Sequence, residues 1–164
     1  MVIKMKRNIK LILLLELLPL LTVILMIGVI SDVNLKHYFI TLFDVYALMG
    51  ILLITISGMF IMGIWKDFGK AFSVGSKKYS LLELKSIVEA VSICQKLVLY
   101  SGLIVVLVST IIVLGQLTDV SGFGKSIASA IISGLYVVII ELFLLPIRGN
   151  AAHVMNVEID IDVE

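Results

Sequence analysis

Four long apolar stretches, separated by shorter polar segments, dominate the chain. They run Leu11–Ile30, Tyr38–Ile64, Leu97–Leu117 and Ile127–Ile147. Each is long enough to cross the hydrocarbon core of a bilayer, which takes about 20 mostly apolar residues, and too long for an ordinary strand. Because backbone polar groups in lipid must be satisfied internally, the pattern predicts helices. We therefore expect an all-α, polytopic membrane protein with four transmembrane helices.

The polar segment 65–96 between the second and third stretches carries a helical pattern of its own. Ser80 and Glu83 have the spacing of a capping box at a helix start. The apolar positions that follow recur with a period of 3.6 residues: Leu81, Leu84, Ile87, Val88, Val91 and Cys94. We expect a short amphipathic helix that leads into the third span. The alternative is a helix that lies on the membrane surface without a partner.

The chain divides into four parts on this basis. They are 1–64 (N-terminal segment and transmembrane helices 1 and 2), 65–96 (loop with the amphipathic helix), 97–147 (transmembrane helices 3 and 4) and 148–164 (acidic tail). The end of the tail reads VEIDIDVE, an alternation of acidic and apolar residues. This alternation fits either a pairing strand or a disordered end, and we expect disorder.

The distribution of charged residues predicts the orientation of the chain in the membrane, and their low number argues against most functions of soluble proteins. Lys and Arg number four before the first span, then one, six, one and one in the successive connections and tail. Positive residues favour the cytoplasmic side, so both termini are expected to be cytoplasmic. Only 15% of the 164 residues are charged, against about 25% in soluble domains. One cysteine, two distant histidines and no phosphate-loop or triad pattern leave no sign of an enzyme, a metal site or nucleic-acid binding.

Three acidic residues lie inside apolar stretches, where each costs about 2.5–3.5 kcal/mol at the bilayer centre. Glu16 falls close to the basic N-terminal segment, and Asp44 falls near the outer end of the second span. Glu141 is surrounded by apolar residues about two turns from the end of the fourth span. Its alternatives are a structural ion pair or hydrogen bond, ion handling, and a side chain that reaches the interface.

Small and polar residues form faces on the last two spans. In the fourth, two series recur every four residues: Ser126, Ala130 and Gly134, with Ser129 and Ser133 beside them. In the third, three residues are seven apart with a threonine beside them: Gly102, Ser109, Gln116 and Thr110. Small faces let membrane helices approach closely. Close packing of the helices is one explanation of these faces. The Gln and Glu that accompany the small residues favour another, in which the faces line a cavity or contact a further helix.

Three stretches follow one another along the chain: FDVYALMGILLIT, KDFGKAFSVGSKKYSLLELKSIVEAV and QLTDVSGFGKSIASAIISGLYVVIIELFLLPI. In this order they resemble MotA of the flagellar stator, within the wider MotA/TolQ/ExbB group. The Leu135–Tyr136 pair is MotA-like, whereas ExbB- and TolQ-type proteins usually carry Glu at the position of Ser129. Two departures stand out: Gln95 replaces an arginine of the family pattern, and the loop 65–96 is much shorter. The resemblance also leaves the family's long C-terminal helix without a counterpart here.

The resemblance implies an ion-driven motor or energy-transducing channel. Five such subunits would form a ring around two single-span MotB-like helices in the bacterial inner membrane. The ion, H⁺ or Na⁺ with H⁺ expected, would be carried by an Asp of the partner, and no resident cofactor is expected. Residues expected to line the ion path or the partner helix are Gly102, Ser109, Thr110, Gln116, Ser129, Ser133, Gly134, Tyr136, Glu141 and Pro146. The shortened loop puts contact with a flagellar rotor, and so flagellar motility, in doubt.

Two alternatives stay open. Glu16 in the first span fits a small four-helix proton-coupled exporter, in which Glu16→Gln abolishes transport. A purely structural, non-conducting membrane subunit fits the small faces as well, and it predicts that Ser133→Val and Glu141→Ala leave activity unchanged.

Overall fold

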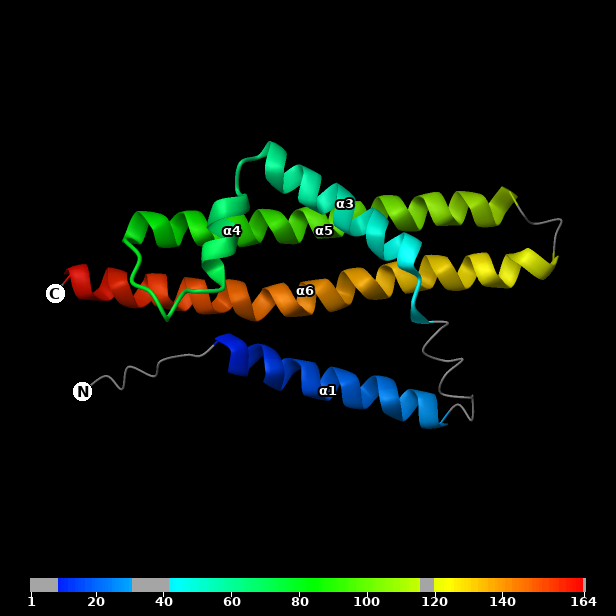
Figure 1. The fold of residues 1–164 in the computed structure, drawn as a ribbon, viewed down its shortest axis with the longest axis horizontal. Helices are drawn as coiled ribbons and strands as arrows, with labels where there is room; N and C mark the ends of the chain where they lie inside the picture. The colour runs from blue at the N-terminus through cyan, green and yellow to red at the C-terminus, as the bar shows by residue number, and fades with distance from the viewer. Residues whose placement is uncertain (1–8, 31–41, 116–119, 164) are drawn as a thin grey trace.

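The computed structural model describes residues 9–30, 42–115 and 120–163, and its described elements are all helices (Figure 1). They are α1 (Ile9–Ile30), α3 (Val45–Ile61), α4 (Trp65–Ala71), α5 (Leu81–Gly115) and α6 (Val120–Val163). Within these ranges the β-type pairing consists of one isolated bridge between Val74 and Lys77. The all-α prediction is confirmed.

Two helices are long and apolar enough to cross a membrane: α5, and the Ile127–Ile159 part of α6. At 1.5 Å per residue, the 35 residues of α5 and the 44 of α6 span about 50 and 65 Å, well beyond the roughly 30 Å hydrocarbon core. Helices α3 and α4 pass the same test only together, and they are bent by 111°. The Leu13–Val29 part of α1 is apolar but shorter. Four membrane spans and cytoplasmic termini therefore stay predictions from the sequence.

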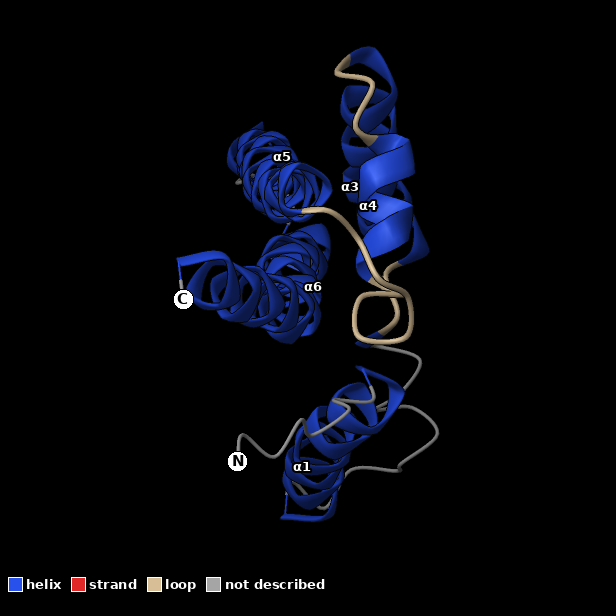
Figure 2. Cartoon of the chain, turned by 90° about the vertical axis from the view of Figure 1, so that its left-hand side faces the viewer, coloured by secondary structure: helices blue, strands red, loops and turns tan. Residues whose placement is uncertain are grey.

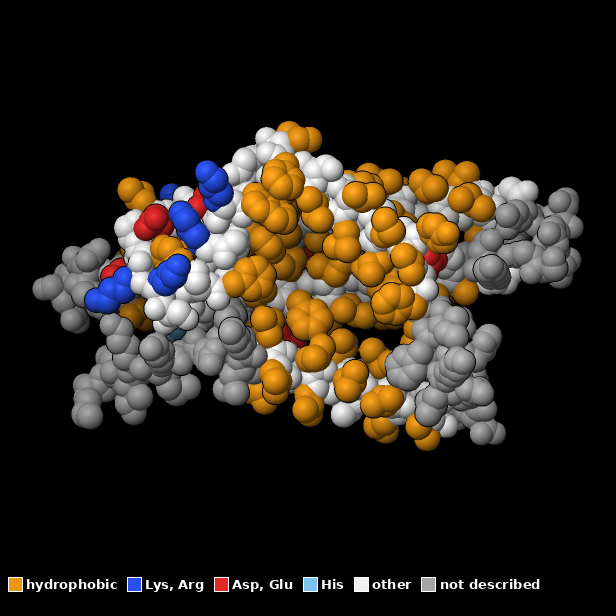
Figure 3. Space-filling view, viewed as in Figure 1, with side chains coloured by type: hydrophobic (Ala, Val, Ile, Leu, Met, Phe, Trp, Pro, Cys, Tyr) orange, Lys and Arg blue, Asp and Glu red, His pale blue; other side chains and the backbone are white. Residues whose placement is uncertain are grey.

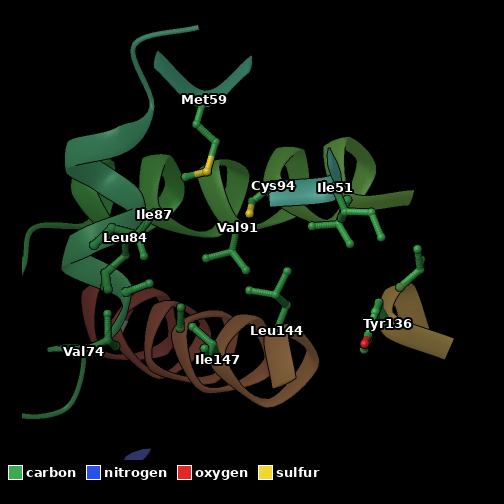
Figure 4. Packing of buried hydrophobic residues seen from close by; sticks show 14 of the residues in the cluster. Ile51, Met59, Val74, Leu84, Ile87, Val91, Cys94, Tyr136, Leu144 and Ile147 are labelled. Atoms are coloured by element: carbon green, nitrogen blue, oxygen red, sulfur yellow. The ribbon is translucent and has the colours of Figure 1, made fainter. Parts of the chain in front are cut away.

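Helices α5 and α6 lie side by side along most of their length, and the other elements gather around them (Figure 1). Helix α3 packs obliquely on α5, while α1 runs beside α6. Seen end on, α3 and α4 lie on one side of the α5–α6 pair, and no described element covers the opposite side (Figure 2). The interior packing comes from the faces of α3, α5 and α6 that meet (Figure 4); the most buried side chains include Ile51, Leu84, Ile87, Val91 and Val98.

The amphipathic segment forms as the sequence predicts. Helix α5 begins at Leu81 and continues without a break into the third apolar stretch. The backbone N–H of Ser80 donates to Oε2 of Glu83 at 3.1 Å, and the N–H of Glu83 donates to Oγ of Ser80 at 3.4 Å. This reciprocal pair is a capping box. Leu84 and Ile87 are buried on the predicted face, so the segment is a partnered helix.

The prediction of a disordered tail is wrong, because α6 continues as a helix to Val163. The sequence around this extension holds a second helical pattern, one that the acidic–apolar alternation hides. Ile147 and Ala151 are buried, and Val154 and Met155 pack partly against the same core. Residues spaced by three, four, seven and eight positions share one helix face. The extension therefore packs on the N-terminal half of α5, and the inferred absence of a long C-terminal helix is corrected.

The bend between α3 and α4 has a local cause. Gly63 follows the end of α3 with φ of +68°, a left-handed conformation that glycine adopts without steric cost. The chain then turns by 111° into α4. The turn brings α4 across the N-terminal part of α5 (Figure 1), where the surface changes from apolar to charged. Apolar side chains cover the middle of the molecule, and charged side chains gather near α4 and the start of α5 (Figure 3).

Candidate functional site

Asp44 connects the start of α3 to α6. Its Oδ1 accepts a hydrogen bond from the N–H of Ala47 at 3.1 Å, which caps α3. Its Oδ2 accepts a hydrogen bond from the hydroxyl of Ser129. The Tyr136 hydroxyl accepts from the Asp44 N–H at 2.7 Å and donates to the carbonyl of Leu42 at 2.7 Å. The carboxylate and the phenol thus fix the entry of α3 against α6, and the sequence did not predict this role for Asp44.

A second polar contact joins α3 to α5. The hydroxyls of Thr55 and Ser101 lie 3.0 Å apart, and both residues are buried. Ser101 also donates to the carbonyl of Val98 at 3.0 Å. A buried hydroxyl without a partner is costly, so this pair fixes the register between the two helices.

The seam between α5 and α6 combines close packing with a polar chain. Gly102 lies directly under Val137, where a Cβ on the glycine would overlap the valine side chain. Further along the seam, Nε2 of Gln95 donates to Oε2 of Glu141 at 2.9 Å. The guanidinium of Arg148 donates to Oε1 of Gln95 at 3.4 Å. Gln95 therefore connects Glu141 and Arg148, which both belong to α6. Of the roles that the sequence leaves open for Glu141, this contact corresponds to the structural hydrogen bond.

The uncovered side of the α5–α6 pair can be located by counting around each helix, at about 100° per residue. On α5, Ser101 faces α3 and Gly102 faces α6, so Thr110, eight residues after Gly102, points away from α3. On α6, Tyr136 faces α3 and Val137 faces α5, so Gly134 turns to the same open side. We call the surface that contains these residues the open face.

The open face is apolar with small and polar positions in it. No atom lies within 4 Å of the position that a Cβ on Gly134 would occupy. The Thr110 side chain is exposed, and its hydroxyl donates to the carbonyl of Val106 at 2.8 Å. Large exposed side chains around them are Leu103, Leu107, Ile131, Val138 and Leu145. An apolar face of this extent needs lipid or another helix to cover it.

The structure separates the predicted lining residues into groups. Thr110 and Gly134 lie on the open face. Four others lie in contacts with α3 or within the seam: Gly102, Ser129, Ser133 and Tyr136. Ser133 is fully buried and donates to the carbonyl of Ser129 at 2.8 Å. Glu141 accepts the hydrogen bond from Gln95. Ser109 and Pro146 are half-buried. Gln116 lies outside the described residues.

Glu16 occupies a separate place between α1 and α6. Its side chain borders a cavity of about 10 Å³ together with Leu20, Leu142 and Phe143. Its Oε2 is buried and has no hydrogen-bond partner among the described residues. The acid therefore faces an apolar gap, and its location does not coincide with the open face.

The charged end of the molecule has its own contacts. Nζ of Lys70 lies 3.0 Å from Oδ1 of Asp67 and 3.6 Å from Oε1 of Glu83. The Asp67 carboxylate is the main reason that the pKa of Lys70 is raised. Hydrogen bonds from the Ser80 N–H and hydroxyl are the main reason that the pKa of Glu83 is lowered. Among the described residues, no three His, Cys, Asp or Glu side chains are grouped as a metal site would require.

Comparisons with protein-family models, with curated proteins and with solved structures find no match for this chain. What the described helices define is an α-helical chain with two, or up to three, helices able to cross a membrane.

Proposed function

We propose that the chain is the ring-forming subunit of a proton-driven membrane motor or energy-transducing channel that resembles MotA. The observation that carries this proposal is the open face of the α5–α6 pair. The other described helices lie away from this face (Figure 2), and it holds Thr110 and Gly134, two of the residues expected to line the partner helix. In the proposed assembly five copies form a ring, and each turns its open face toward a central single-span partner.

The open face has the chemistry that a central helix requires. Without a hydrophobic driving force in lipid, helices associate through close packing, which small residues permit. Gly134 leaves room for such an approach, and the Thr110 hydroxyl is exposed on the same side. The apolar remainder of the face offers a partner helix no hydrogen bonds or ion pairs that would have to break when the two move against each other. A charge that crosses the membrane gains about 2.3 kcal/mol per 100 mV, which is the energy source in this proposal.

The polar contacts on the opposite side give the subunit a rigid frame. Asp44 and Tyr136 hold the start of α3, and Thr55 with Ser101 holds its middle. In the proposed mechanism these residues position α5 and α6 and take no part in moving the ion. We assign Glu141 a structural role as well: it lies seven residues after Gly134 and so on the same side of α6, but its carboxylate accepts the hydrogen bond from Gln95.

The proposal includes a topology and a location. α1 and the α3–α4 region contribute two spans, α5 and α6 contribute two more, and both termini lie in the cytoplasm of a bacterium whose inner membrane holds the ring. The six lysines of 65–96 support this orientation. The extension of α6 beyond Ile147 carries the subunit into the cytoplasm, where it packs on the start of α5.

An ion-flux measurement tests this function. The chain is purified with its co-purifying partner, reconstituted into vesicles, and assayed with a pH-sensitive dye under a potassium diffusion potential. We expect Gly134→Leu to block the open face and to abolish flux. The matched control is Ser57→Leu, because Ser57 is exposed on α3 two residues from the inward-facing Thr55. Equal flux in the two variants would reject the open face as the ion path.

A second function is favoured by Glu16 alone. Its buried, unpaired Oε2 beside Leu142 and Phe143 is the feature expected of a proton-coupled exporter. Acids within membrane segments commonly mark proton or ion pathways. In that case the chain is a dimer, and Glu16→Gln abolishes drug or cation transport while Gly134→Leu leaves it unchanged.

A further inference from the structure

Helix α4 lies at the boundary between the apolar and the charged surfaces. It leaves α3 through a 111° bend and runs across the direction of α5 and α6 (Figure 1). If α5 and α6 cross the bilayer, their axes follow the membrane normal, and α4 then lies in the membrane plane. The lysine-rich surface lies on one side of α4 and the apolar belt on the other (Figure 3).

The aromatic side chains of this region are exposed. Trp65 is 43% exposed and Phe72 is 44% exposed. Phe60, at the end of α3, stacks on Trp65 with ring centroids 4.9 Å apart, and it is itself 60% exposed. Trp is enriched at membrane–water interfaces, where its apolar ring and its polar N–H are both accommodated, and the two exposed Phe rings add apolar surface beside it.

The charge of the region is positive. The segment 65–96 holds six lysines and three acids. Two of those acids, Asp67 and Glu83, contact Lys70. Lys66, next to Trp65, is exposed and makes no ion pair with another described side chain. Lys77, Lys78 and Lys85 are exposed as well. The negative surface of an anionic bilayer attracts such lysines.

We propose that α4 lies in the headgroup layer and binds anionic lipid headgroups, with Lys66 as the main cationic contact and with Trp65 and Phe72 at the acyl boundary. Basic residues beside exposed aromatic rings are the features of an interfacial helix. The proposal requires that α5 and α6 cross the membrane. It does not require ion conduction, so the flux experiment and the lipid experiment can fail independently.

The single tryptophan of the chain, Trp65, reports directly on this surface. The full chain is reconstituted into vesicles that contain either brominated phosphatidylglycerol or brominated phosphatidylcholine at the same mole fraction, and Trp fluorescence is recorded. We expect shallow bromine positions to quench more than deep ones. We also expect the anionic lipid to quench more than the zwitterionic lipid at equal depth, which measures its relative affinity for the Trp65 surroundings.

Charge variants separate a specific contact from a general electrostatic effect. Lys66→Gln should lower the relative affinity for the anionic lipid about fivefold, the ratio that corresponds to about 1 kcal/mol for one lysine near an anionic surface. Lys66→Arg should retain it. The matched control is Lys96→Gln, which removes the same charge; Lys96 is exposed and precedes Leu97, whose side chain faces α3 at Gly58.

Three outcomes of the quenching experiment on the wild-type chain would overturn the proposal. The first is equal quenching of the wild-type chain by the two lipids. The second is quenching of Trp65 by aqueous iodide with none by brominated lipid, which would place α4 in water. The third is protection from both quenchers, which would place a protein surface, either a partner or a second copy, on Trp65. An equal loss of anionic preference in Lys66→Gln and Lys96→Gln would also reject the contact with Lys66.

Discussion

Val137 of α6 occupies the space that a Cβ on Gly102 of α5 would need. The two helices therefore approach most closely where one of them has no side chain. Gly102→Ala should force them apart and destabilise the protein by about 1–3 kcal/mol, the usual cost of overpacking. Thermal unfolding in detergent measures this change.

The control for this prediction is Gly134→Ala, because nothing lies within 4 Å of the new methyl group; it should not destabilise the protein and should stabilise it by about 0.5–1 kcal/mol, since Ala is the better helix former. The double variant Gly102→Ala with Val137→Ala should recover part of the loss, since residues in contact do not add independently. An unchanged melting temperature for Gly102→Ala would show that the seam is looser than described.

Tyr136→Phe should also lower stability. The substitution removes the hydroxyl that links the Asp44 N–H to the Leu42 carbonyl. Both hydrogen bonds are part-buried, so the loss should fall near the lower end of the range of about 1–3 kcal/mol for an unsatisfied buried group. The matched control is Tyr46→Phe, because Tyr46 is 91% exposed. If both variants melt at the same temperature, the Tyr136 hydroxyl does not hold α3 on α6.

The capping box at the start of α5 predicts a pH dependence. The folded state lowers the pKa of Glu83, chiefly through the hydrogen bond from the Ser80 N–H. Because the pKa is lower in the folded state, the ionised Glu83 side chain stabilises the start of α5 fully at pH values above its unfolded pKa of about 4.3. This stabilisation is lost as the pH falls through the folded pKa. Protection of the first α5 amides against hydrogen exchange, corrected for intrinsic rates, should be constant near neutral pH and should fall in acid.

Ser80→Ala should lower that protection at neutral pH, because it deletes the side chain that accepts from the Glu83 N–H while the hydrogen bond from the backbone N–H of residue 80 to Glu83 remains. Ser86→Ala is the control, since the Ser86 hydroxyl donates only to the Leu82 carbonyl within the helix. Equal protection in the wild type and in Ser80→Ala would contradict a capping role.

Glu141 offers a test of structural against ionic function. Gln at position 141 can still accept the hydrogen bond from Nε2 of Gln95, so Glu141→Gln should leave ion flux close to that of the wild type. Glu141→Leu should lower stability by about 1–3 kcal/mol, because the Gln95 amide loses its acceptor. Abolished flux in Glu141→Gln, with unchanged stability, would return Glu141 to the ion path.

The sequence predicts local features of this fold well, because their causes are local. The Ser80–Glu83 cap and the apolar face of α5 depend on residues three or four positions apart, and both form as expected. The expectation of a disordered tail overlooks the helical end of α6, although the spacing of Ile147, Ala151 and Met155 carries its signal. The alternation of acidic and apolar residues at the end of the chain masks that spacing.

The contacts between helices depend on residues far apart in sequence, and they were less predictable. Asp44 contacts Ser129 and Tyr136, which lie 85 and 92 residues away. Periodicity shows which residues share a face of one helix, but it does not say which neighbour that face meets. Ser133 and Gly134 are adjacent in the small-residue series, yet Ser133 is buried and Gly134 is on the open side.

The central claim is that the open face of α5 and α6 surrounds another helix. Native mass spectrometry of the complex, extracted from its own membrane in mild detergent, tests this claim most directly. The account predicts five copies of the chain together with two copies of one single-span protein, and loss of that protein in Gly134→Leu but not in Ser57→Leu. A stable assembly of this chain alone, without a second protein in either the wild type or the variants, would contradict it.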